Sequence, residues 1–492
     1  MVKPLLDFTT MKQTTKSEPI ALVVDLDDTL IRTDLLLESA LVALKVAPLK
    51  FAAALASLRH GKARLKARLA ALADLRADLL PYNEQVLELV RSRRAEGAPV
   101  ALATASNRKY ADAVAEHLGL FDAIYASSAE SNLSGPRKAA QLVERFGPGG
   151  FDYAADAHKD LPVWQKSRQA IAVDPSPRTL VALSAVGVPC QIIQTPDKSS
   201  KAWRMTVLEA LRPHQWAKNG LVFLPLFAAH MLGDLDAVLA CLLVFIGFNL
   251  TASAGYVVND LLDLEADRAH PRKRRRPFSS GALPVRTGVV LVPILILAGL
   301  VPAMLVSVLL AGILLLYLAT TLGYSYYLKR KPTIDVLTLA SLYTLRVIGG
   351  AVAIGVELSF WLLAFSMSLF LSLAYVKRYT ELYGLQRNGV RWPSGRGYSV
   401  DDLPLLLTLG LVAGYGAVLV LALYINSPEI ELLYTHPNLI WLVCPLLLYW
   451  VVRIWTITHR GQMHDDPLVF ALENRISLLT ICIAGLVVVL AI

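Results

Sequence analysis

Acidic side chains gather in one polar stretch that directly follows a long apolar run. Asn259 to Pro277 reads N-D-L-L-D-L-E-A-D-R-A-H-P-R-K-R-R-R-P. Asp260, Asp263 and Asp267 recur at spacings of three and four, which would place three carboxylates on one face of a continuous helix. Crowded carboxylates need cations, and their hard oxygen atoms suit Mg²⁺ shared with a substrate phosphate. The spacing therefore predicts a magnesium site.

Basic residues follow these acids at once, namely Arg268, Arg272, Lys273, Arg274, Arg275 and Arg276. They would neutralise the remaining charge of a polyphosphate, so the stretch as a whole indicates a magnesium diphosphate site. A second interpretation stays open, because basic clusters beside membrane spans often only fix orientation or hold anionic lipid headgroups. That interpretation gives the three acids no role.

The composition indicates a membrane protein with a soluble N-terminal part. The chain has 492 residues, of which 55% are hydrophobic and 18% charged, and its mean hydropathy is +0.49. Residues 1–202 have an ordinary soluble composition, whereas most of the chain after Asn219 is apolar. The four cysteines are far apart and show no disulfide or zinc pattern. The first twelve residues lack an apolar signal segment, so we expect the N-terminal part to stay in the cytoplasm.

The apolar part contains about nine segments that could each cross a bilayer, by the rule of about 20 residues per crossing. Basic residues fall in or beside every second link between them, and the other links contain no Lys or Arg. We therefore interpret the net charge of +9 as membrane topology, with basic links in the cytoplasm, and expect no nucleic acid. The expected spans are 219–234, 237–258, 285–301, 304–327, 333–354, 358–376, 403–425, 437–457 and 470–491.

Four motifs in the soluble part occur in a characteristic order. An apolar strand runs into acids at Leu22–Asp28, a second ends at Thr104, Lys138 follows in G-P-R-K-A, and Tyr153–Asp160 reads Y-A-A-D-A-H-K-D. This set resembles the haloacid dehalogenase (HAD) superfamily of phosphatases over about residues 1–195. The resemblance implies an α/β Rossmann-like parallel sheet with helices on both faces.

The HAD resemblance assigns a role to each motif. Asp25 would be the nucleophile and Asp27 the acid and base that serves the leaving alcohol and then water. Asp156, with Asp160 nearby, would bind Mg²⁺ together with Asp25 and the carbonyl of Asp27. Phosphoryl oxygens would be held by Thr104 and Lys138.

Two further segments complete the expected organisation of the N-terminal domain. Between Leu30 and Tyr82 the sequence has helical periodicity and no strand signal, which favours a small helical cap, over about residues 31–95, that selects substrates. Residues 196–205 are a polar linker, and residues 206–492 form the membrane domain.

The membrane domain resembles the UbiA superfamily of intramembrane prenyltransferases through N-D-x-x-D-x-x-x-D and its helical layout. The resemblance implies an all-α polytopic domain in which Asn259 joins Asp260, Asp263 and Asp267 in holding Mg²⁺. Members that prenylate aromatic rings usually repeat D-x-x-x-D later, but here Thr338 and Leu339 follow Asp335. R-P-H-Q-W-A-K-N and H-P-R-K-R instead resemble the polyprenyl-phosphate phosphoribosyltransferase branch, which makes decaprenylphosphoryl-5-phosphoribose. That branch implies phosphate-binding roles for Lys218, Asn219, Arg268, Lys273, Arg274, Tyr326, Lys329, Arg346, Lys377 and Arg378.

Arg346 is the most informative of these residues, because a charge at the bilayer centre costs roughly 2.5–3.5 kcal/mol unless it meets a partner. A substrate phosphate is one partner, and an internal ion pair with Asp335 is the other. Lys377 and Arg378, near the end of the sixth expected span, either bind substrate or only snorkel to the interface.

We therefore expect a bifunctional enzyme of the inner membrane with one Mg²⁺ site in each domain, both on the cytoplasmic side. The first step would transfer 5-phosphoribose from phosphoribosyl pyrophosphate to a polyprenyl phosphate. The HAD domain would then remove the 5-phosphate, giving a lipid-linked ribose or arabinose precursor for envelope polysaccharide. Two alternatives stay open: a prenyltransferase using isoprenyl diphosphate and an aromatic acceptor, and a transporter or lipid-binding protein with a regulatory soluble domain. A homo-oligomer also stays open.

Overall fold

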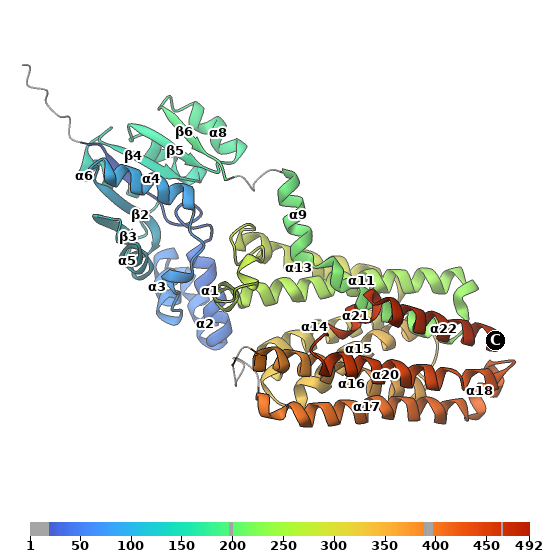
Figure 1. The fold of residues 1–492 in the computed structure, drawn as a ribbon. Coiled ribbons are helices and arrows are strands. Elements are labelled where there is room, and N and C mark those ends of the chain that lie inside the picture. Colours follow the sequence, from blue (N-terminus) through green and yellow to red (C-terminus); the bar gives the residue numbers. More distant parts are fainter. Residues whose placement is uncertain (1–18, 196–199, 388, 390–396, 464–465) are drawn as a thin grey trace, which may run out of the picture. The chain divides into compact units, whose positions relative to one another are not determined.

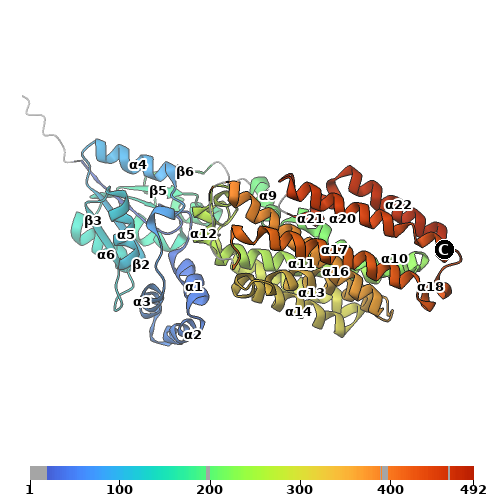
Figure 2. The ribbon, with the colours of Figure 1, turned by 60° about the horizontal axis from the view of Figure 1, so that its bottom comes forward.

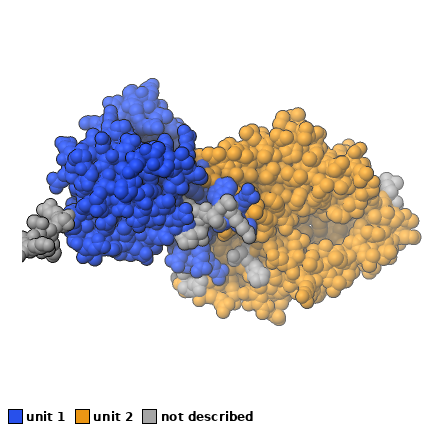
Figure 3. Space-filling view, turned by 90° about the horizontal axis from the view of Figure 1, so that it is seen from above, with its two compact units in different colours: residues 1–206, 262–286 blue, residues 207–261, 287–492 orange. Residues whose placement is uncertain are grey.

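The computed structural model describes residues 19–195, 200–387, 389, 397–463 and 466–492. Within it the chain divides into two compact units (Figure 3). Unit 1 comprises Met1–Thr206 and Leu262–Arg286, and unit 2 comprises Val207–Leu261 and Thr287–Ile492. Unit 1 is therefore built from two separate stretches of the chain. Part of the expected linker, residues 196–199, lies outside the described residues, and helix α9 begins at Ser200.

Unit 1 is built on a six-stranded parallel sheet of order β3-β2-β1-β4-β5-β6 (Figure 1). The strands are short apolar runs, and β1, β4 and most of β2 and β5 are buried, as expected when helices cover both faces. Their bounds are β1 Ala21–Val24, β2 Val100–Asn107, β3 Ala123–Ser127, β4 Phe151–Ala155, β5 Gln169–Val173 and β6 Cys190–Ile193. The sheet confirms the expected HAD-like α/β domain.

Helices connect the strands, and three consecutive helices lie within the segment 31–95 that we expected to form a cap. We call these helices the cap, namely α1 Leu35–Val46, α2 Pro48–Ala56 and α3 Lys62–Leu72, with the short turn η1 Ser57–His60 between α2 and α3. Asp34 caps α1 by accepting hydrogen bonds from the backbone N–H groups of Leu36 and Leu37. The other helices of this unit are α4 Glu84–Ala95, α5 Arg108–Leu118, α6 Pro136–Phe146, α7 Leu161–Trp164 and α8 Pro177–Ser184, with η2 Ala77–Leu79 and η3 His158–Asp160.

Unit 2 is all-α, and its long apolar helices lie side by side (Figures 1 and 2). Seven helices of the described residues are long and apolar enough to cross a membrane, and a bent pair gives an eighth. The seven are α11 Leu235–Leu262, α13 Val285–Val306, α14 Val308–Tyr326, α15 Ile334–Ala353, α16 Phe360–Arg387, α17 Leu403–Ile425 with η9 Val400–Asp402, and α20 Val443–His459 with α19 Pro437–Ile440. The pair is α21 Pro467–Glu473 and α22 Arg475–Ala491, bent by 80°.

The expected count of about nine spans is thus approximate. The first expected span, 219–234, is not one long helix, and Pro225 interrupts it. It consists instead of η5 Pro213–Phe223, α10 Leu224–Ala228 and η6 Met231–Gly233. The shorter elements α9 Ser200–Leu211, α18 Pro428–Leu433 and η8 Leu328–Arg330 complete the helices outside the spans.

The acidic stretch differs from its prediction in one respect. We expected the acids on one face of a continuous helix, but α11 ends at Leu262 and α12 Leu264–Ala269 begins after Asp263. Asp263 has φ −108° and ψ 16°, and its carboxylate forms an ion pair with Lys45. Aspartate has a low propensity for the interior of a helix. The helix therefore breaks at Asp263, whose side chain forms the ion pair with Lys45. The basic residues Lys273–Arg275 follow in the short turn η7.

Candidate active sites

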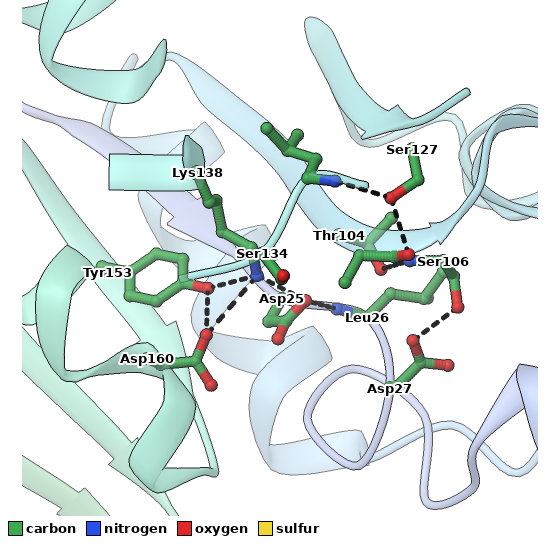
Figure 4. Close-up of polar contacts among 12 residues, drawn as sticks. Asp25, Leu26, Asp27, Thr104, Ser106, Ser127, Ser134, Lys138, Tyr153 and Asp160 are labelled. Atoms are coloured by element: carbon green, nitrogen blue, oxygen red, sulfur yellow. Dashed lines mark hydrogen bonds and ion pairs between the residues drawn. The ribbon is translucent and has the colours of Figure 1, made fainter. Parts of the chain in front are cut away.

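The first candidate site lies where the central strands of unit 1 end. Asp25 directly follows β1, and Thr104 lies in the neighbouring strand β2. Figure 4 shows Lys138, from α6, reaching between Asp25 and Asp160. Its Nζ atom lies 3.1 Å from Asp25 Oδ1, and all three side chains are buried. The carboxyl ends of adjacent parallel strands are where such folds bind ligands, so this edge is the expected position for a phosphate.

Two hydrogen bonds fix the orientation of the Asp27 carboxyl group beside this site. Its Oδ1 accepts a hydrogen bond of 2.9 Å from the Leu35 N–H, and its Oδ2 accepts one of 2.6 Å from the Ser106 hydroxyl (Figure 4). Burial and the nearby charge of Asp34 raise the pKa of Asp27 to about 7, although both hydrogen bonds act in the opposite direction. A carboxyl group with a pKa near neutrality can both donate and accept a proton.

Three carboxylates of unit 1 come close enough to hold one metal ion. Ligand atoms of Asp25, Asp156 and Asp160 lie within 4.8 Å of one another. Asp156 Oδ1 and Asp160 Oδ2 are buried atoms without a hydrogen-bond partner among the described residues. Burial and neighbouring acids raise the pKa of Asp156 to about 8 and also raise the pKa of Asp160. Buried carboxylates that keep two oxygens without a hydrogen-bond partner among the described residues fit a hard divalent cation such as Mg²⁺.

Three polar residues to which the sequence analysis gave no role also support this site. Tyr153 accepts a hydrogen bond of 2.8 Å from Lys138 Nζ and donates one of 3.1 Å to Asp160 Oδ1. Ser106 lies two residues beyond Thr104, whose hydroxyl accepts a 2.9 Å hydrogen bond from the Ser106 N–H. Lys66, from the cap helix α3, is bonded to the Ala105 carbonyl, and burial lowers its pKa. The available signals were the place of Tyr153 at the start of the Y-A-A-D-A-H-K-D motif, of Ser106 two residues after Thr104 and of Lys66 in the cap.

The second candidate site lies in unit 2 around Arg346 of α15, which is 3% exposed. Its Nε donates a 2.6 Å hydrogen bond to Asn219 Oδ1, and Nη2 donates one of 2.9 Å to the Tyr317 hydroxyl. The guanidinium also lies 4.8 Å from the centre of the Tyr317 ring. In the part of the chain that the structure describes, Arg346 forms no ion pair with a carboxylate. The expected alternative, a pair with Asp335, is therefore not formed.

Lys218, next to Asn219 in the chain, belongs to the same region. Its ammonium forms an ion pair with Asp466 Oδ2, and Lys377 Nζ lies 3.5 Å from the same oxygen. Asp466 also accepts hydrogen bonds from the Leu468 and Val469 N–H groups through Oδ1, capping α21. Asp466 was not among the expected site residues. Its only sequence signal is the order of an acid, a proline and an apolar run, which is typical of a helix start.

Arg378, the neighbour of Lys377, is neutralised inside the protein. It is fully buried, and its Nε lies 2.6 Å from Asp335 Oδ2. A second ion pair joins it to Glu381, and the Tyr324 hydroxyl donates to Asp335 over 2.9 Å. Because two acids pair with this one guanidinium, Arg378 has no excess positive charge with which to bind a substrate phosphate.

Each acid of the motif is paired with a cation of its own unit. In unit 2, Asp260 Oδ1 lies 2.6 Å from Arg212 Nη2. In unit 1, Asp263 Oδ1 lies 2.6 Å from Lys45 Nζ. The boundary between the units falls inside the motif, so Asp260 belongs to unit 2, and Asp263 and Asp267 belong to unit 1. Asp267, also in unit 1, pairs with Arg276 over 2.6 Å.

The remaining expected residues occupy varied positions. Arg268 is buried and pairs with Glu38, whereas Lys273 and Arg274 are exposed in η7. Tyr326 ends α14, Lys329 lies in η8, and Asn259 is half-buried in α11.

These helices and motif acids define an intramembrane transferase joined to a HAD-like hydrolase. The model of the UbiA prenyltransferase family matches residues 221–479, and that of the haloacid dehalogenase-like hydrolases matches residues 22–163. The chain belongs to the UbiA prenyltransferase family and carries an N-terminal HAD domain.

Relatives share one or both of these parts. The protein y4nM of Sinorhizobium fredii is 38% identical over 93% of this chain and 88% of its own length. Nodulation protein NoeC of Azorhizobium caulinodans is 37% identical over 57% of this chain and 91% of its own. Decaprenyl-phosphate phosphoribosyltransferase of Corynebacterium glutamicum is 39% identical over 38% of this chain and 57% of its own. A UbiA homologue from Archaeoglobus fulgidus, solved bound to GPP and Mg²⁺, covers 58% of this chain and 99% of its own at 18% identity, with a TM-score of 0.44.

Proposed function

We propose that this multi-pass membrane enzyme transfers 5-phosphoribose from phosphoribosyl pyrophosphate to a polyprenyl phosphate and then removes the 5-phosphate with its HAD domain. The product would be a polyprenylphosphoryl ribose, a precursor of lipid-linked ribose or arabinose for envelope polysaccharide. Similarity to decaprenyl-phosphate phosphoribosyltransferases supports the first step, and the HAD domain in the same chain supports the second.

The observation that carries the proposal is the excess of positive charge around Arg346. This buried guanidinium has no carboxylate partner among the described residues, while Lys218 and Lys377 share the single acid Asp466. Buried charge of one sign is costly unless an anion balances it. A donor with phosphate at both ends of a sugar supplies such an anion.

In the transfer step, the chain's residues position and neutralise, and no protein nucleophile is needed. Mg²⁺, held by Asp260, Asp263 and Asp267 with Asn259, would supply neutralising charge to the leaving diphosphate. Lys218, Arg346 and Lys377 would hold donor phosphate. The bond from the anomeric carbon to diphosphate breaks, and an oxygen of the lipid phosphate bonds to that carbon from the opposite face.

Further cations would serve the same donor. We propose that Asn219 orients Arg346, as its 2.6 Å hydrogen bond to that guanidinium supports. Tyr326, Lys329, Lys273 and Arg274 remain proposed phosphate ligands, on the strength of the family resemblance. For Arg268 and Arg378 we propose instead that they stabilise the fold, since each is buried in an ion pair.

In the phosphatase step, Asp25 attacks phosphorus and the bond from phosphorus to the ribose oxygen breaks. Asp27 donates its proton to that oxygen, then takes one from the water that hydrolyses the aspartyl-phosphate, so the carboxylate of Asp25 is restored. Lys138 and Thr104 would hold the phosphoryl oxygens. Mg²⁺ bound by Asp25, Asp156 and Asp160 would supply charge neutralisation, as the closeness of the three acids and the unpartnered Asp156 Oδ1 and Asp160 Oδ2 atoms among the described residues support.

We also propose that the membrane is the inner membrane and that both sites face the cytoplasm. The alternation of basic and non-basic links supports this orientation under the positive-inside rule.

The test incubates membranes containing the full chain with radiolabelled phosphoribosyl pyrophosphate, polyprenyl phosphate and Mg²⁺. Label should enter the lipid fraction, and Asp25→Asn should make a phosphorylated lipid accumulate. Asp263→Ala should abolish transfer, and label that still enters lipid in that variant would overturn the transferase site. Label that enters an aromatic acceptor from isoprenyl diphosphate, and none from phosphoribosyl pyrophosphate, would identify the alternative prenyltransferase.

A further inference from the structure

The cap of unit 1 contains a long segment without acids. Between Ser39 and Ala73 the sequence has no Asp or Glu. The same segment contains seven basic residues, namely Lys45, Lys50, Arg59, Lys62, Arg64, Lys66 and Arg68. Such an imbalance is unusual for a chain that has 48 basic and 39 acidic residues in all. The cap therefore carries strong positive charge.

Not all of this charge is free to act at the surface. Lys45 pairs with Asp263, and Lys66 is bonded to Ala105 and Asn132 beside the phosphatase site. The other five basic side chains lie at exposed positions. Lys50, Arg59 and Lys62 follow one another around the turn from α2 to α3.

Large apolar side chains are exposed among these basic residues. Leu49 is 88% exposed, Leu55 46% and Leu58 50%, and Val46 is also exposed at the end of α1. On their other side, α2 and α3 bury Ala54, Leu65 and Leu69 in a small core of the cap. The exposed leucines therefore do not belong to the hydrophobic core of the cap. We call Val46, Leu49, Lys50, Leu55, Leu58, Arg59 and Lys62 the cap tip.

The cap tip differs from the rest of the HAD domain. Of the large hydrophobic side chains that are exposed between residues 19 and 195, four belong to the cap tip, and the others are Val181 and Ile192. Helix α2 also lies at the end of the cap away from the sheet (Figures 1 and 2). A protruding surface that combines leucines with basic residues is typical of elements that enter the interface of a bilayer.

We propose that the cap tip binds the surface of the bilayer that unit 2 spans, with its leucines among the acyl chains and its basic residues on anionic phospholipid headgroups. Two features of the molecule favour this partner. The exposed basic residues complement the negative charge of such headgroups. Unit 2 also tethers the cap to a bilayer, so even a weak surface affinity is effective.

The proposal goes beyond the proposed phosphatase activity and stands without it. Helix α1 connects the cap to the phosphatase site, since Asp34 caps it and the Leu35 N–H is bonded to Asp27. A cap resting on lipid would therefore hold that site beside phosphate groups carried by membrane lipids.

The test measures the depth of the cap tip in reconstituted vesicles of the full-length chain. In a background whose four cysteines are serine, Leu55→Cys carries an environment-sensitive fluorophore, and Val181→Cys on α8 is the matched control at another exposed apolar position. Lipids brominated in their acyl chains quench only fluorophores that enter the bilayer. Vesicles are phosphatidylcholine with or without phosphatidylglycerol.

We expect a blue shift and loss of fluorescence at position 55 and neither at position 181. Phosphatidylglycerol should increase the loss, and adding Lys50→Gln, Arg59→Gln and Lys62→Gln should remove that increase without lowering the thermal midpoint of the chain. Equal quenching at both positions, or none at position 55 in either lipid, would overturn the proposal. Equal quenching at position 55 in vesicles with and without phosphatidylglycerol would overturn the role of the basic residues. Hydrolysis of a soluble phosphate ester by the same samples tests the proposed phosphatase activity separately, because that reaction does not require the cap tip to bind lipid.

Discussion

Arg268 and Glu38 form a buried, two-pronged ion pair. Nη1 lies 2.9 Å from Oε2 and Nη2 lies 2.5 Å from Oε1, and neither side chain is more than 6% exposed. Glu38 belongs to the cap helix α1, whereas Arg268 follows the acidic motif 230 residues later. The pair therefore fixes the segment Leu262–Arg286 to the HAD domain within unit 1.

Glu38→Gln should destabilise unit 1 by about 3 kcal/mol or more, because it leaves the Arg268 guanidinium buried without its counter-charge. Hydrogen exchange should accelerate in both α1 and residues 262–286. Glu84→Gln is the matched control, since Glu84 and Arg91 form an exposed pair at 3.9 Å. Unchanged exchange in residues 262–286 would contradict the structural role of the pair.

Asp27 should impose a pH dependence that varies with the leaving group. Burial and Asp34 raise its pKa to about 7, so the proton-donating form is present below pH 7 and is lost as the pH rises through that value. Release of alcohol from an alkyl phosphate in the first turnover should fall accordingly. p-Nitrophenyl phosphate needs no such proton and is the control. The same pH profile for both esters would exclude Asp27 as the acid.

Mg²⁺ should stabilise unit 1 by binding the cluster of Asp25, Asp156 and Asp160, in which two oxygens lack a hydrogen-bond partner among the described residues. Thermal midpoints of the wild-type chain should rise with Mg²⁺, and about 2.7 kcal/mol of stabilisation is expected at 100 times the dissociation constant. Asp156→Asn should remove most of this rise, whereas Asp112→Asn, at an exposed ion pair, should not. Because burial raises the pKa of Asp156 to about 8, protons should compete with the metal as the pH falls below 8.

Arg346→Gln should weaken binding of inorganic pyrophosphate to the full chain by roughly 100-fold, as expected from the loss of hydrogen bonds to a charged group. Transfer of label from phosphoribosyl pyrophosphate should fall with it. Hydrolysis of p-nitrophenyl phosphate by the HAD domain should stay unchanged and reports on folding. Arg460→Gln, at an exposed position, is the control. Equal pyrophosphate affinities in both variants would remove Arg346 from the site.

Asp466→Asn should have the opposite effect and tighten pyrophosphate binding about tenfold in buffer without Mg²⁺, because it removes the carboxylate that competes for Lys218 and Lys377. Asparagine can still cap α21, so the fold should persist. Asp236→Asn, exposed at the start of α11, is the matched control. Weaker binding in Asp466→Asn would instead indicate that this acid helps to hold the substrate.

Much of the architecture follows from local patterns. Apolar runs of about 20 residues predict the spans, and the order of Asp25, Thr104, Lys138 and Asp156 predicts the HAD-like sheet, because each pattern reflects contacts within one element or one fold. The prediction of one helix for the first expected span is wrong, although the sequence shows Pro225 within it. That prediction rested on apolar composition alone, which does not account for the restriction that proline places on a helix backbone.

What the sequence could not reveal depends on partners far away in the chain. Helical spacing favoured a continuous face for Asp263, but its ion pair with Lys45 joins residues 218 positions apart. The same holds for Arg346, for which an ion pair with Asp335 was one of the two predicted partners and which instead donates hydrogen bonds to Asn219 and Tyr317. Spacing within one element says which residues can share a face, and it does not say which residue of another element arrives there.

The discontinuous make-up of unit 1 limits how the protein can be dissected. A fragment ending near residue 206 would lack Arg268 and would leave the buried Glu38 carboxylate without its ion-pair partner. It would also lack Phe278, whose side chain is fully buried. A soluble version of the hydrolase should therefore carry residues 262–286 as a graft. Gene fission between the two catalytic parts would meet the same obstacle, which gives a physical reason for the two parts to remain in one polypeptide.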